Sequence, residues 1–425
     1  MKVVFTHLWP ESNAGDYAIV LGTIQAITDA SNTPPKFVGL TTFGEHSDNI
    51  NGHFHNTIKL GVELRPSFTP GYKNSYCEEY SFLEKVSFSI KYLLIFSLLM
   101  LRMAHMARYF LSNRDKETLK IIAEADLVIV KGGAFLMGFK GISGTMYLIR
   151  NALMVMWCSK LNNNCIIAPH SFGPFYGRIQ KWLLESMLKK TKVYSRENIS
   201  IKTLSKLNID SSYMPDMAFY IRPNLGKPVK VNQKNKLVAF TVRPCPTFMS
   251  KKMQSQYYKK FANVITTLII DGYEVIFVPQ VTGPDEREDD RLAIKEIMDR
   301  IKTKRGDLKH VTTAEVCTLE DKMQIYEKCI CCIGTRMHSV IFSTLVSTKV
   351  IAIAYLGPKH KGIMKNIGLE DYVLDINYFS EGQLIDMFYK ALIYQDTAIV
   401  DSKVKSLKDD IAHNFSSICR IHKSG

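Results

Sequence analysis

The segment GTRMHS at residues 334–339 carries the residue types in this chain that are best suited to chemistry. It follows an apolar run at residues 329–333, which indicates a buried strand, and precedes a second run at 340–345, which indicates a helix. Open α/β sheets bind ligands at the carboxyl ends of strands, and helix amino termini favour anions. The pattern therefore predicts that Arg336 and His338 hold an anionic small molecule.

Two further basic residues stand at expected strand ends in the same half of the chain. Arg243 ends an apolar run at residues 237–242, and Lys359 follows another at 350–354. Guanidinium groups bind phosphate or carboxylate oxygens in two-point fashion, whereas lysine supplies a point charge. Each charge-assisted hydrogen bond is worth about 1.5–3 kcal/mol. These residues are predicted to form one anion-binding cluster with Arg336 and His338.

Short polar motifs also follow the expected strands of the first half. In the motif Asn13-Ala-Gly15-Asp16, Gly15 permits close backbone approach, and Asp16 is expected to cap the following helix. A contact between Asp16 and an acceptor hydroxyl is the alternative. Gly132 and Gly133 end a strand at 127–130, where paired glycines admit a ligand or another backbone.

His170 and Asp216 are the remaining candidates in this half. His170 ends a strand at residues 165–168, where it either faces a ligand or makes a structural hydrogen bond. Asp216 follows a short strand at 211–214 and is either a catalytic acid or base, or a turn residue. The neighbouring pair Arg196 and Glu197 favours a structural role.

Strand-like and helix-like segments alternate throughout the 425 residues, which predicts parallel sheets covered by helices. The length suits two domains. The polar stretch at 222–235 contains two prolines and a glycine and is expected to link them. The expected fold is therefore α/β with two Rossmann-like domains, at residues 1–225 and 236–425, and a ligand cleft between them.

Composition limits the classes of partner and cofactor. The formal net charge of +15 favours anionic partners, such as nucleic acid, phosphorylated substrates or an acidic membrane surface. There is no G-x-G-x-x-G or Walker motif, which disfavours a nicotinamide cofactor or P-loop chemistry. The nine cysteines fit no zinc or cluster spacing and are expected to be reduced. No metal site is expected.

Residues 87–111 contain an unbroken, mostly apolar stretch at 92–101, which is flanked by Lys91, Arg102 and Arg108. A spanning helix needs about 20 apolar residues, and this segment falls short. It is typical of a helix that lies in the membrane interface with its basic residues near lipid head groups. A buried helix of the first domain is the alternative. The first residues run directly into a strand, so no leader segment is expected.

Taken together, these motifs resemble those of the polysaccharide pyruvyl transferase family. The matching pieces occur in order at residues 13–16, 126–133, 170–174, 195–197, 215–219, 243 and 334–339, and continue into 351–355 and Lys359. The resemblance implies a GT-B-like fold, with phosphoenolpyruvate as donor and a sugar of an oligosaccharide as acceptor. The product would be a cyclic pyruvate ketal of a capsule or exopolysaccharide. In the family, residues that match Arg243, Arg336 and His338 bind the donor.

This chemistry assigns roles to the candidates. Lys359 joins the three donor-binding residues, and His338 or Asp216 serves as the general acid, with Asp16 or His170 as the base. The acceptor is expected to contact Asn13, Asp16, Gly132, Gly133 and His170. No cofactor, metal or nucleic acid is expected. The acceptor is expected to be linked to polyprenyl diphosphate, and the protein to be cytoplasmic with a peripheral contact on the inner membrane face. The alternatives are a GT-B nucleotide-sugar glycosyltransferase and a saccharide- or membrane-binding scaffold.

Overall fold

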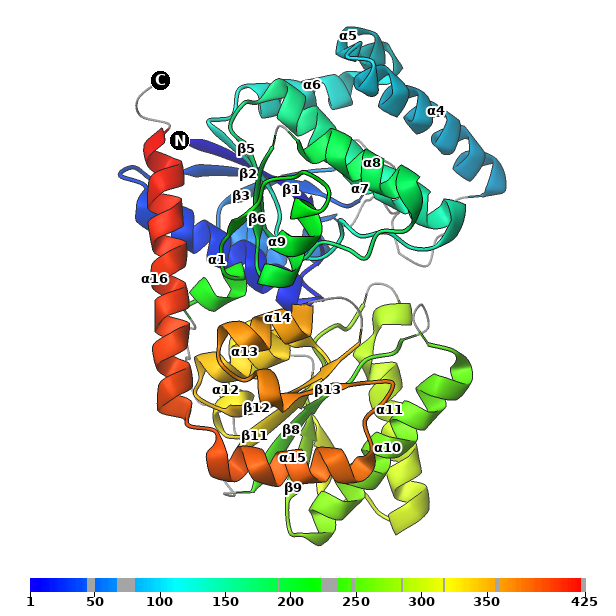
Figure 1. The fold of residues 1–425 in the computed structure, drawn as a ribbon, viewed down its shortest axis with the longest axis vertical. Helices are drawn as coiled ribbons and strands as arrows, with labels where there is room; N and C mark the ends of the chain where they lie inside the picture. Colours follow the sequence, from blue (N-terminus) through cyan, green and yellow to red (C-terminus); the bar gives the residue numbers. More distant parts are fainter. Residues whose placement is uncertain are drawn as a thin grey trace. The chain divides into compact units, whose positions relative to one another are not determined.

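The computed structural model describes residues 1–43, 50–66, 81–189, 191–222, 236–245, 249–283, 286–315, 318–355 and 359–421. The chain forms two compact units (Figure 1). Unit 1 contains Met1–Glu11, Ile19–Met217 and Asp410–Gly425, and unit 2 contains Ser12–Ala18 and Ala218–Asp409. Thus the loop after the first strand groups with unit 2, and the end of the last helix with unit 1. The linker expected at 222–235 lies, apart from Arg222, outside the described residues.

Unit 1 contains a parallel sheet in the order β3-β2-β1-β4-β5-β6-β7. Its strands are β1 (Lys2–Leu8), β2 (Lys36–Thr41), β3 (Val62–Arg65), β4 (Leu127–Val130), β5 (Cys165–His170), β6 (Lys192–Ser195) and β7 (Ser212–Tyr213). Its helices are α2 (Ile50–His53), α3 (His55–Lys59), α4 (Phe82–Met100), α5 (Ala104–Ala107), α6 (Asn113–Ala123), α7 (Gly141–Leu161), α8 (Gly177–Leu188) and α9 (Asn198–Ser205), with the short turn η1 (Arg108–Phe110). The short turn η2 (Met217–Tyr220) begins at the last residue of this stretch of unit 1 and continues in unit 2.

Unit 2 contains a second parallel sheet in the order β10-β9-β8-β11-β12-β13. Its strands are β8 (Leu237–Thr241), β9 (Glu274–Phe277), β10 (Val311–Thr313), β11 (Cys331–Gly334), β12 (Lys349–Ala354) and β13 (Val373–Asp375). Its helices are α10 (Lys251–Ile270), α11 (Asp290–Arg305), α12 (Leu319–Glu327), α13 (Met337–Leu345), α14 (Lys359–Asn366) and α15 (Glu381–Tyr394), with short turns η3 (Glu286–Glu288) and η4 (Glu370–Tyr372).

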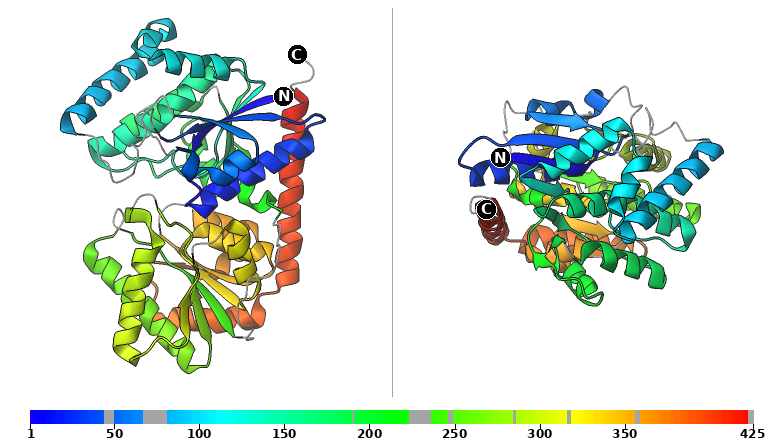
Figure 2. Two further views of the ribbon diagram at one scale, coloured as in Figure 1. Left: turned by 180° about the vertical axis from the view of Figure 1, so that it is seen from behind. Right: turned by 90° about the horizontal axis from the view of Figure 1, so that it is seen from above.

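Two helices have residues in both units: α1 (Ala14–Ala30) near the start of the chain and α16 (Thr397–Ile421) at its end. The last turns of α16 lie close to the start of β1 in all three ribbon views (Figure 2). In each sheet the first strand along the chain pairs with the fourth, which is β1 with β4 in unit 1 and β8 with β11 in unit 2. This is the strand order of a Rossmann fold, and the change of direction beside the first strand marks the ligand edge. The prediction of parallel sheets covered by helices is confirmed.

Local sequence signals begin many of these helices. Side chains of Ser81, Ser112, Ser250, Thr318 and Ser380 each accept a hydrogen bond from the first turn of the helix that follows. Such caps satisfy backbone donors that a helix leaves unpaired. The strands are instead stabilised by burial, since every residue of β4, β5, β8 and β11 is buried. Cys331 and Cys332 are among them, as their apolar surroundings predicted.

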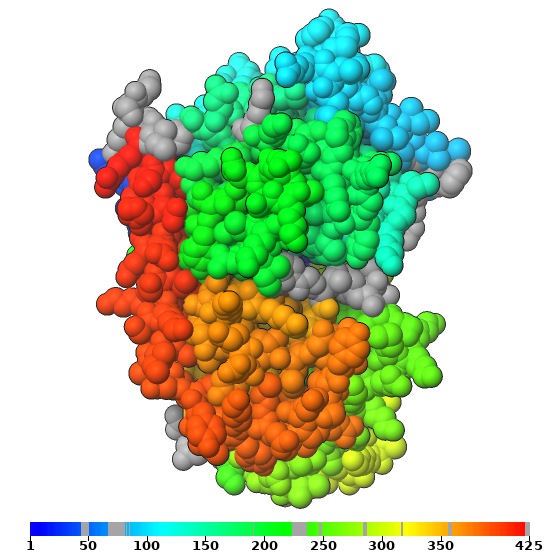
Figure 3. Space-filling view, in the orientation of Figure 1, coloured from blue at the N-terminus to red at the C-terminus, as the bar shows by residue number. Residues whose placement is uncertain are grey.

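The segment at 87–111 combines features of both interpretations of its sequence. It lies largely in α4 and α5, which form a ridge on the outside of unit 1 (Figure 3). On the inner side, Ile95, Phe96 and Leu99 join the core that α6, α7 and α8 form with the sheet. On the outer side, Leu83 is 78% exposed and Ile90 is 64% exposed. None of the helices in the described residues is both long and apolar enough to cross a bilayer.

Candidate functional site

The carboxyl ends of three adjacent strands in unit 2 bring the predicted basic residues together. Arg243 follows β8, the residues Arg336 and His338 follow β11, and Lys359 begins α14 after β12. Because β8, β11 and β12 are neighbours in a parallel sheet, their ends meet at one edge. Contacts with Glu288 and Tyr355 then connect Arg243 with Arg336 and with Lys359.

Small and hydroxyl residues hold the loop that carries Arg336. The Ser339 Oγ donates to the Arg336 carbonyl at 2.6 Å and lies 2.7 Å from the Thr241 Oγ1. The Thr335 Oγ1 donates to the Thr241 carbonyl at 2.8 Å. A Cβ at Gly334 would lie 2.7 Å from the Ser339 Oγ, so only glycine leaves room for this bond. The motif thus fixes the backbone from which Arg336 and His338 project.

Asp290 holds the guanidinium group of Arg336 in a buried ion pair. The Arg336 Nε and one terminal nitrogen donate to the Asp290 Oδ1 at 2.9 and 2.6 Å. The other oxygen of Asp290 accepts from the backbone N–H groups of Gln280 and Val281, at 2.9 and 3.0 Å. A buried charge is tolerated when it is paired and hydrogen-bonded in this way. Arg336 is consequently fixed in position by Glu288, in the loop after β9, and by Asp290, at the start of α11.

Glu288 bridges the two arginines. Its carboxylate lies 3.3 Å from Arg243 and 3.5 Å from Arg336, and its carbonyl accepts from Arg336 at 2.6 Å. Burial alone would raise the pKa of the Glu288 carboxyl, but Arg243 and Arg336 hold that pKa below its usual value. The Glu288 side chain is 43% exposed. An anionic ligand that reached these arginines would therefore compete with a carboxylate at the surface.

Tyr355 packs between Arg243 and Lys359. The Arg243 Cζ lies 4.4 Å from the Tyr355 ring centroid, and the Lys359 Nζ donates to the Tyr355 hydroxyl at 2.5 Å. Burial would raise the pKa of the Tyr355 phenol, but Arg243, Lys359 and Arg336 lower that pKa to about 8. Arg243, Arg336 and Lys359 face two described carboxylates, Glu288 and Asp290, which leaves one formal positive charge in this group.

The loop after β1 belongs to the same unit and packs against His338. Asn13 forms an antiparallel bridge with Val281, and the Ala14 N–H donates to the Gln280 carbonyl at 3.0 Å. A Cβ at Gly15 would lie only 2.0 Å from the His338 Nδ1. The absence of a side chain at Gly15 is therefore what allows the imidazole to sit against the first turn of α1.

Asn13, and not Asp16, caps α1. The Asn13 Oδ1 accepts from the backbone N–H groups of Gly15 and Asp16, at 3.2 and 3.3 Å. Asp16 lies inside the first turn, where a negative charge suits the helix dipole. The expectation that Asp16 caps the helix is wrong, because α1 begins at Ala14, two residues before Asp16. Its predicted contact with an acceptor stays a prediction.

Gly132 and Gly133 lie in unit 1, where they extend β4 along β5. A Cβ at Gly132 would lie 2.6 Å from the Pro169 carbonyl oxygen, which is backbone and cannot move aside. Gly133 has a φ of +143° and accepts a hydrogen bond from the Ser171 N–H at 2.8 Å. This close approach of two backbones explains both glycines, and their predicted contact with the acceptor stays a prediction.

His170 is fully buried in unit 1 between Phe135 and Phe172, with ring centroids 4.6 and 5.0 Å away. Its Nε2 accepts a hydrogen bond from the Leu136 N–H at 3.0 Å. Burial, together with the charges of Arg196 and Lys131, holds the pKa of His170 well below its usual value. The ring is thus neutral and enclosed, which favours the structural alternative over the role of general base.

Asp216 forms a buried ion pair with Arg196, also in unit 1. The two side chains are 1% and 2% exposed, and the Arg196 Nη1 lies 2.5 Å from the Asp216 Oδ2. The Arg196 Nε donates to the Ser171 Oγ at 2.7 Å, which joins the ends of β5 and β6. Both partners are used in holding strand ends together, so the geometry favours a structural role for Asp216 over that of general acid.

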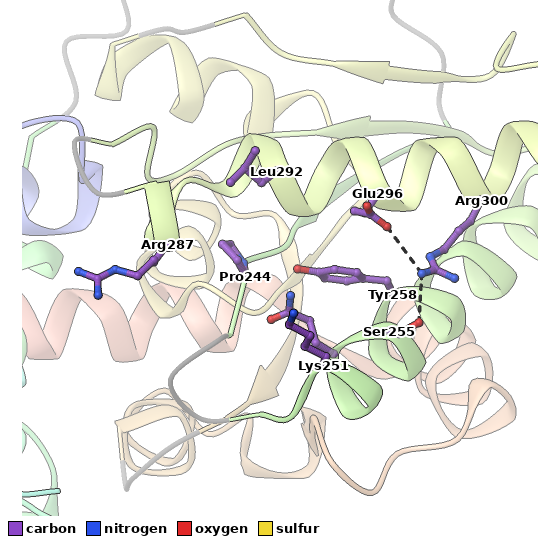
Figure 4. Close-up of a pocket in the computed structure, with 9 residues that line it drawn as sticks. Pro244, Lys251, Ser255, Tyr258, Arg287, Leu292, Glu296 and Arg300 are labelled. Carbon is purple, nitrogen blue, oxygen red and sulfur yellow. Dashed lines mark hydrogen bonds and ion pairs between the residues drawn. The ribbon is translucent and has the colours of Figure 1, made fainter. Parts of the chain in front are cut away.

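A pocket of about 450 Å³ opens between α10 and α11 in unit 2 (Figure 4). Its lining consists of Pro244, Lys251, Gln254, Ser255, Tyr258, Arg287, Leu292, Glu296 and Arg300. Arg300 is held by Ser255 at 3.1 Å and by Glu296 at 3.6 Å. The volume lies in the range of small-ligand pockets. No predicted site residue lines it, and Pro244 connects it to Arg243 along the chain.

The sequence interpretation missed Tyr355, Glu288 and Asp290 as parts of the basic cluster. Tyr355 stood within a motif but received no role. Glu288 and Asp290 belong to the acidic run DEREDD at residues 285–290, between a strand and a helix of a strongly basic chain. That local excess of acidic residues was the available signal, since carboxylates at a ligand edge pair with arginines from other strands.

Comparison with known proteins identifies the family. The family model for polysaccharide pyruvyl transferase matches residues 13–357. The amylovoran biosynthesis protein AmsJ of Erwinia amylovora is 28% identical over 285 residues. That match covers 62% of this chain and 65% of AmsJ, so the chain spans slightly less than two thirds of this relative's length.

Solved structures of low sequence identity share the fold. Anabaena HepE, in complex with UDP and glucose, is 10% identical with a TM-score of 0.53, covering 98% of this chain and 100% of its own. The UDP-N-acetylglucosamine 2-epimerase of Neisseria meningitidis is 10% identical with a TM-score of 0.52, covering 99% and 100%. The fold is therefore GT-B-like with two Rossmann-like domains, as predicted. The cleft expected between the domains stays a prediction.

Proposed function

The chain belongs to the polysaccharide pyruvyl transferase family, and we propose that it transfers pyruvate from phosphoenolpyruvate to a sugar of a lipid-linked oligosaccharide. The product is a cyclic pyruvate ketal in capsule or exopolysaccharide biosynthesis. The observation that carries this proposal is the cluster of Arg243, Arg336 and Lys359 with His338 at the ligand edge of unit 2.

The charge and geometry of this cluster suit the proposed donor. Phosphoenolpyruvate carries a phosphate and a carboxylate on a three-carbon frame, and each group can accept a two-point contact from a guanidinium. Arg336 is pre-organised by Asp290, and the guanidinium of Arg243 contacts Glu288, the Pro244 carbonyl and the ring of Tyr355.

The reaction needs one group that donates a proton to the donor and one that accepts protons from the acceptor. Protonation of the methylene carbon makes the neighbouring carbon electrophilic, and a sugar hydroxyl attacks it. Phosphate then leaves with the electron pair of the broken C–O bond, and a second hydroxyl closes the ketal. Arg243 and Arg336 stabilise the charge that accumulates on the leaving phosphate.

His338 is the general acid in this scheme. It lies in the first turn of α13, partly exposed, with its ring against the Gly15 backbone. Asp216, the other candidate, is committed to Arg196. General acids of this kind contribute about 10²–10⁴-fold to a rate.

The direct test incubates the purified protein with phosphoenolpyruvate and candidate saccharide acceptors. Phosphate release and a mass increase of the acceptor by one pyruvate ketal are expected. His338→Ala and Lys359→Ala should each lower turnover by on the order of 10²-fold or more. Lys361→Ala is the matched control, because Lys361 lies on the exposed side of the same helix. Unchanged turnover in the His338 variant would exclude this site.

A nucleotide-sugar glycosyltransferase is the competing function, because the structural neighbours include proteins described with UDP or UDP-N-acetylglucosamine. Thermal unfolding with each ligand separates the two. Phosphoenolpyruvate should raise the midpoint in wild type and not in Arg243→Ala. A shift with UDP-sugars alone would instead support the glycosyltransferase.

The acceptor is proposed to be linked to polyprenyl diphosphate, and the protein to work in the cytoplasm at the inner membrane face. The ridge formed by α4 and α5 supports this part. Its outer surface exposes Leu83, Val86, Ile90, Leu93 and Leu94 on α4. Arg102 and Arg108 are exposed nearby, where they can meet anionic lipid head groups.

Vesicle binding tests the membrane contact. The protein should cosediment with anionic vesicles and bind less to zwitterionic ones, because basic residues add electrostatic attraction to apolar insertion. Ile90→Ser combined with Leu94→Ser should weaken this binding. Ile393→Ser is the control, since Ile393 is 70% exposed on α15 of unit 2. Equal vesicle binding by the two variants would remove α4 from the proposal.

A further inference from the structure

We propose that Tyr355 is the general base that takes the proton from the attacking sugar hydroxyl, with its phenolate held by Lys359 and Arg243. The inference rests on the proposed ketal transfer and assigns the proton acceptor that this reaction requires. Of the two bases expected from the sequence, His170 is enclosed by phenylalanine rings. Asp16, in the first turn of α1, stays the alternative to Tyr355.

The position of Tyr355 places it at the ligand edge of unit 2. It is the residue directly after β12, whose neighbour β11 delivers Arg336 and His338. The side chain is partly exposed, so its hydroxyl is not sealed in the core. Its ring lies beneath the guanidinium of Arg243, the residue assigned to the donor. A group that contacts a donor-binding residue is well placed to meet a hydroxyl that attacks the donor.

The charges around Tyr355 favour its ionised form. Cations approach from three elements: Arg243 after β8, Arg336 after β11, and Lys359 on α14. Lys359 makes the shortest contact, 2.5 Å to the phenol oxygen, and its ammonium lies 4.6 Å from the ring centroid. A lysine ammonium stabilises a phenolate more strongly than a phenol, because both partners of the hydrogen bond are then charged.

Among the described residues, Glu288, Asp290 and His360 are further titratable groups that face this cluster. Cys245 and Tyr257 contact the backbone of Arg243. Glu288 and Asp290 are paired with the arginines, which limits their effect on the phenol. His360 is buried beneath the ring, with centroids 5.0 Å apart, and its Nε2 lies 3.1 Å from the Thr335 carbonyl. The net result is a pKa of about 8 for Tyr355, close to an operating pH at which a base works efficiently.

The proton and electron balance closes with this assignment. The phenolate oxygen takes the hydroxyl proton, and the hydroxyl oxygen uses the freed pair to bond the electrophilic carbon. Tyr355 then passes that proton to the departing phosphate and, as phenolate again, accepts the proton of the second hydroxyl. Two hydroxyl protons are released. One is bound by the phosphate, and the other replaces the proton that His338 gave to the methylene carbon.

A spectroscopic titration tests the ionisation without any substrate. The near-ultraviolet absorbance of tyrosinate should show one component near pH 8 in wild type. This component should be absent in Tyr355→Phe and should move toward the ordinary tyrosine range in Lys359→Met. Tyr389→Phe is the matched control, because burial and a hydrogen bond to the Asp271 carboxylate raise the pKa of the Tyr389 phenol. A wild-type component near pH 8 that persists in Tyr355→Phe overturns the inference.

The dependence of turnover on pH tests the role itself. In wild type, kcat/KM should rise with pH through about 8, since the phenolate is the active form. Tyr355→Phe should lose this rise and lower kcat by on the order of 10²-fold. Its thermal unfolding midpoint, measured without phosphoenolpyruvate, should stay close to that of wild type. Unchanged kcat in this variant overturns the role. If neither protein uses phosphoenolpyruvate, the proposed function fails, yet the substrate-free titration still decides whether Tyr355 ionises.

Discussion

The two sheets of this protein share the Rossmann strand order but differ in how their strand ends are used. In unit 1 the polar residues at the ends of β1, β5 and β6 are buried, since His7, His170 and Arg196 are each less than 10% exposed. Their described contacts are with the Asn151 carbonyl, the Leu136 N–H and the Asp216 carboxylate, respectively. In unit 2 the corresponding edge carries an excess of cations, with Glu288, Tyr355 and His338 reaching the surface. From this comparison we expect the edge of unit 1 to stabilise the fold and the edge of unit 2 to bind an anion.

The largest effect is expected from Arg336→Ala. Turnover should fall by on the order of 10³-fold, because a pre-organised cation is lost from the leaving phosphate. Arg336→Lys should recover only part of this loss, since lysine keeps the charge but not the fork. Steady-state kinetics and thermal unfolding should be measured together, because the change also leaves Asp290 unpaired. Wild-type turnover in Arg336→Ala would contradict the proposal that the edge of unit 2, unlike that of unit 1, binds the donor.

In unit 1 the matching change, Arg196→Ala, should act on stability. Removing one partner of a buried ion pair costs about 3–5 kcal/mol, here by leaving Asp216 without its 2.5 Å contact. Urea unfolding measures this loss. The double variant Arg196→Met with Asp216→Leu should recover much of it, because no charge is then buried alone. If Arg196→Ala abolished turnover at unchanged stability, the edge of unit 1 would also be a binding site.

A smaller effect concerns the pH dependence of stability. His7 is buried, stacked on Phe135 at 4.5 Å, and burial lowers its pKa to about 4. The unfolded chain therefore binds its proton at higher pH than the folded one, so stability falls as pH falls from 6.5 toward 4. The loss should be on the order of 2 kcal/mol by pH 4.5.

The histidine prediction is measured by urea unfolding at several pH values. His7→Asn should flatten the dependence, since asparagine tolerates the left-handed backbone that His7 adopts, with φ at +60°. The exposed His413→Asn is the control. An equally steep loss of stability in His7→Asn would show that other groups dominate acid unfolding.

The smallest effect is expected from Gly15→Ala. The added methyl would lie 2.0 Å from the His338 Nδ1, so the imidazole must shift. Turnover should fall by about tenfold, which corresponds to about 1.4 kcal/mol of the barrier. Gly382→Ala is the matched control, because a Cβ there meets no atom within 4 Å. Equal kinetics in the two variants would mean that the position of His338 is unimportant.

Local patterns in the sequence predicted most strands but missed a long buried helix. The strand ends after β8, β11 and β12 were predicted because short apolar runs ended at basic or polar residues. Helix α7 was missed because residues 152–158 are buried on every side, which leaves no polar stripe to mark a helical period. Buried helices and buried strands have the same apolar composition, and only packing separates them.

The sequence interpretation of single polar residues was less reliable than that of the strands. Asp16 and Asn13 are both suitable caps, and the choice depends on where the helix begins. Asp216 had the chemistry of a general acid, yet its buried contact with Arg196 gives it a structural partner 20 residues away. A side chain's residue type specifies what it can do, whereas its partners decide what it does.

The sequence by itself determined the two parallel sheets, the family motifs and the basic residues at the edge of unit 2, because these depend on local apolar patterning and on short spacings. Only the tertiary structure decided which charges are neutralised. Glu288 and Asp290 lie between β9 and the first turn of α11, whereas Tyr355 follows β12. Their effect on Arg243, Arg336 and Lys359 depends on distances of a few ångströms. Electrostatic energy depends on such distances and on burial, and neither can be read from spacing along the chain.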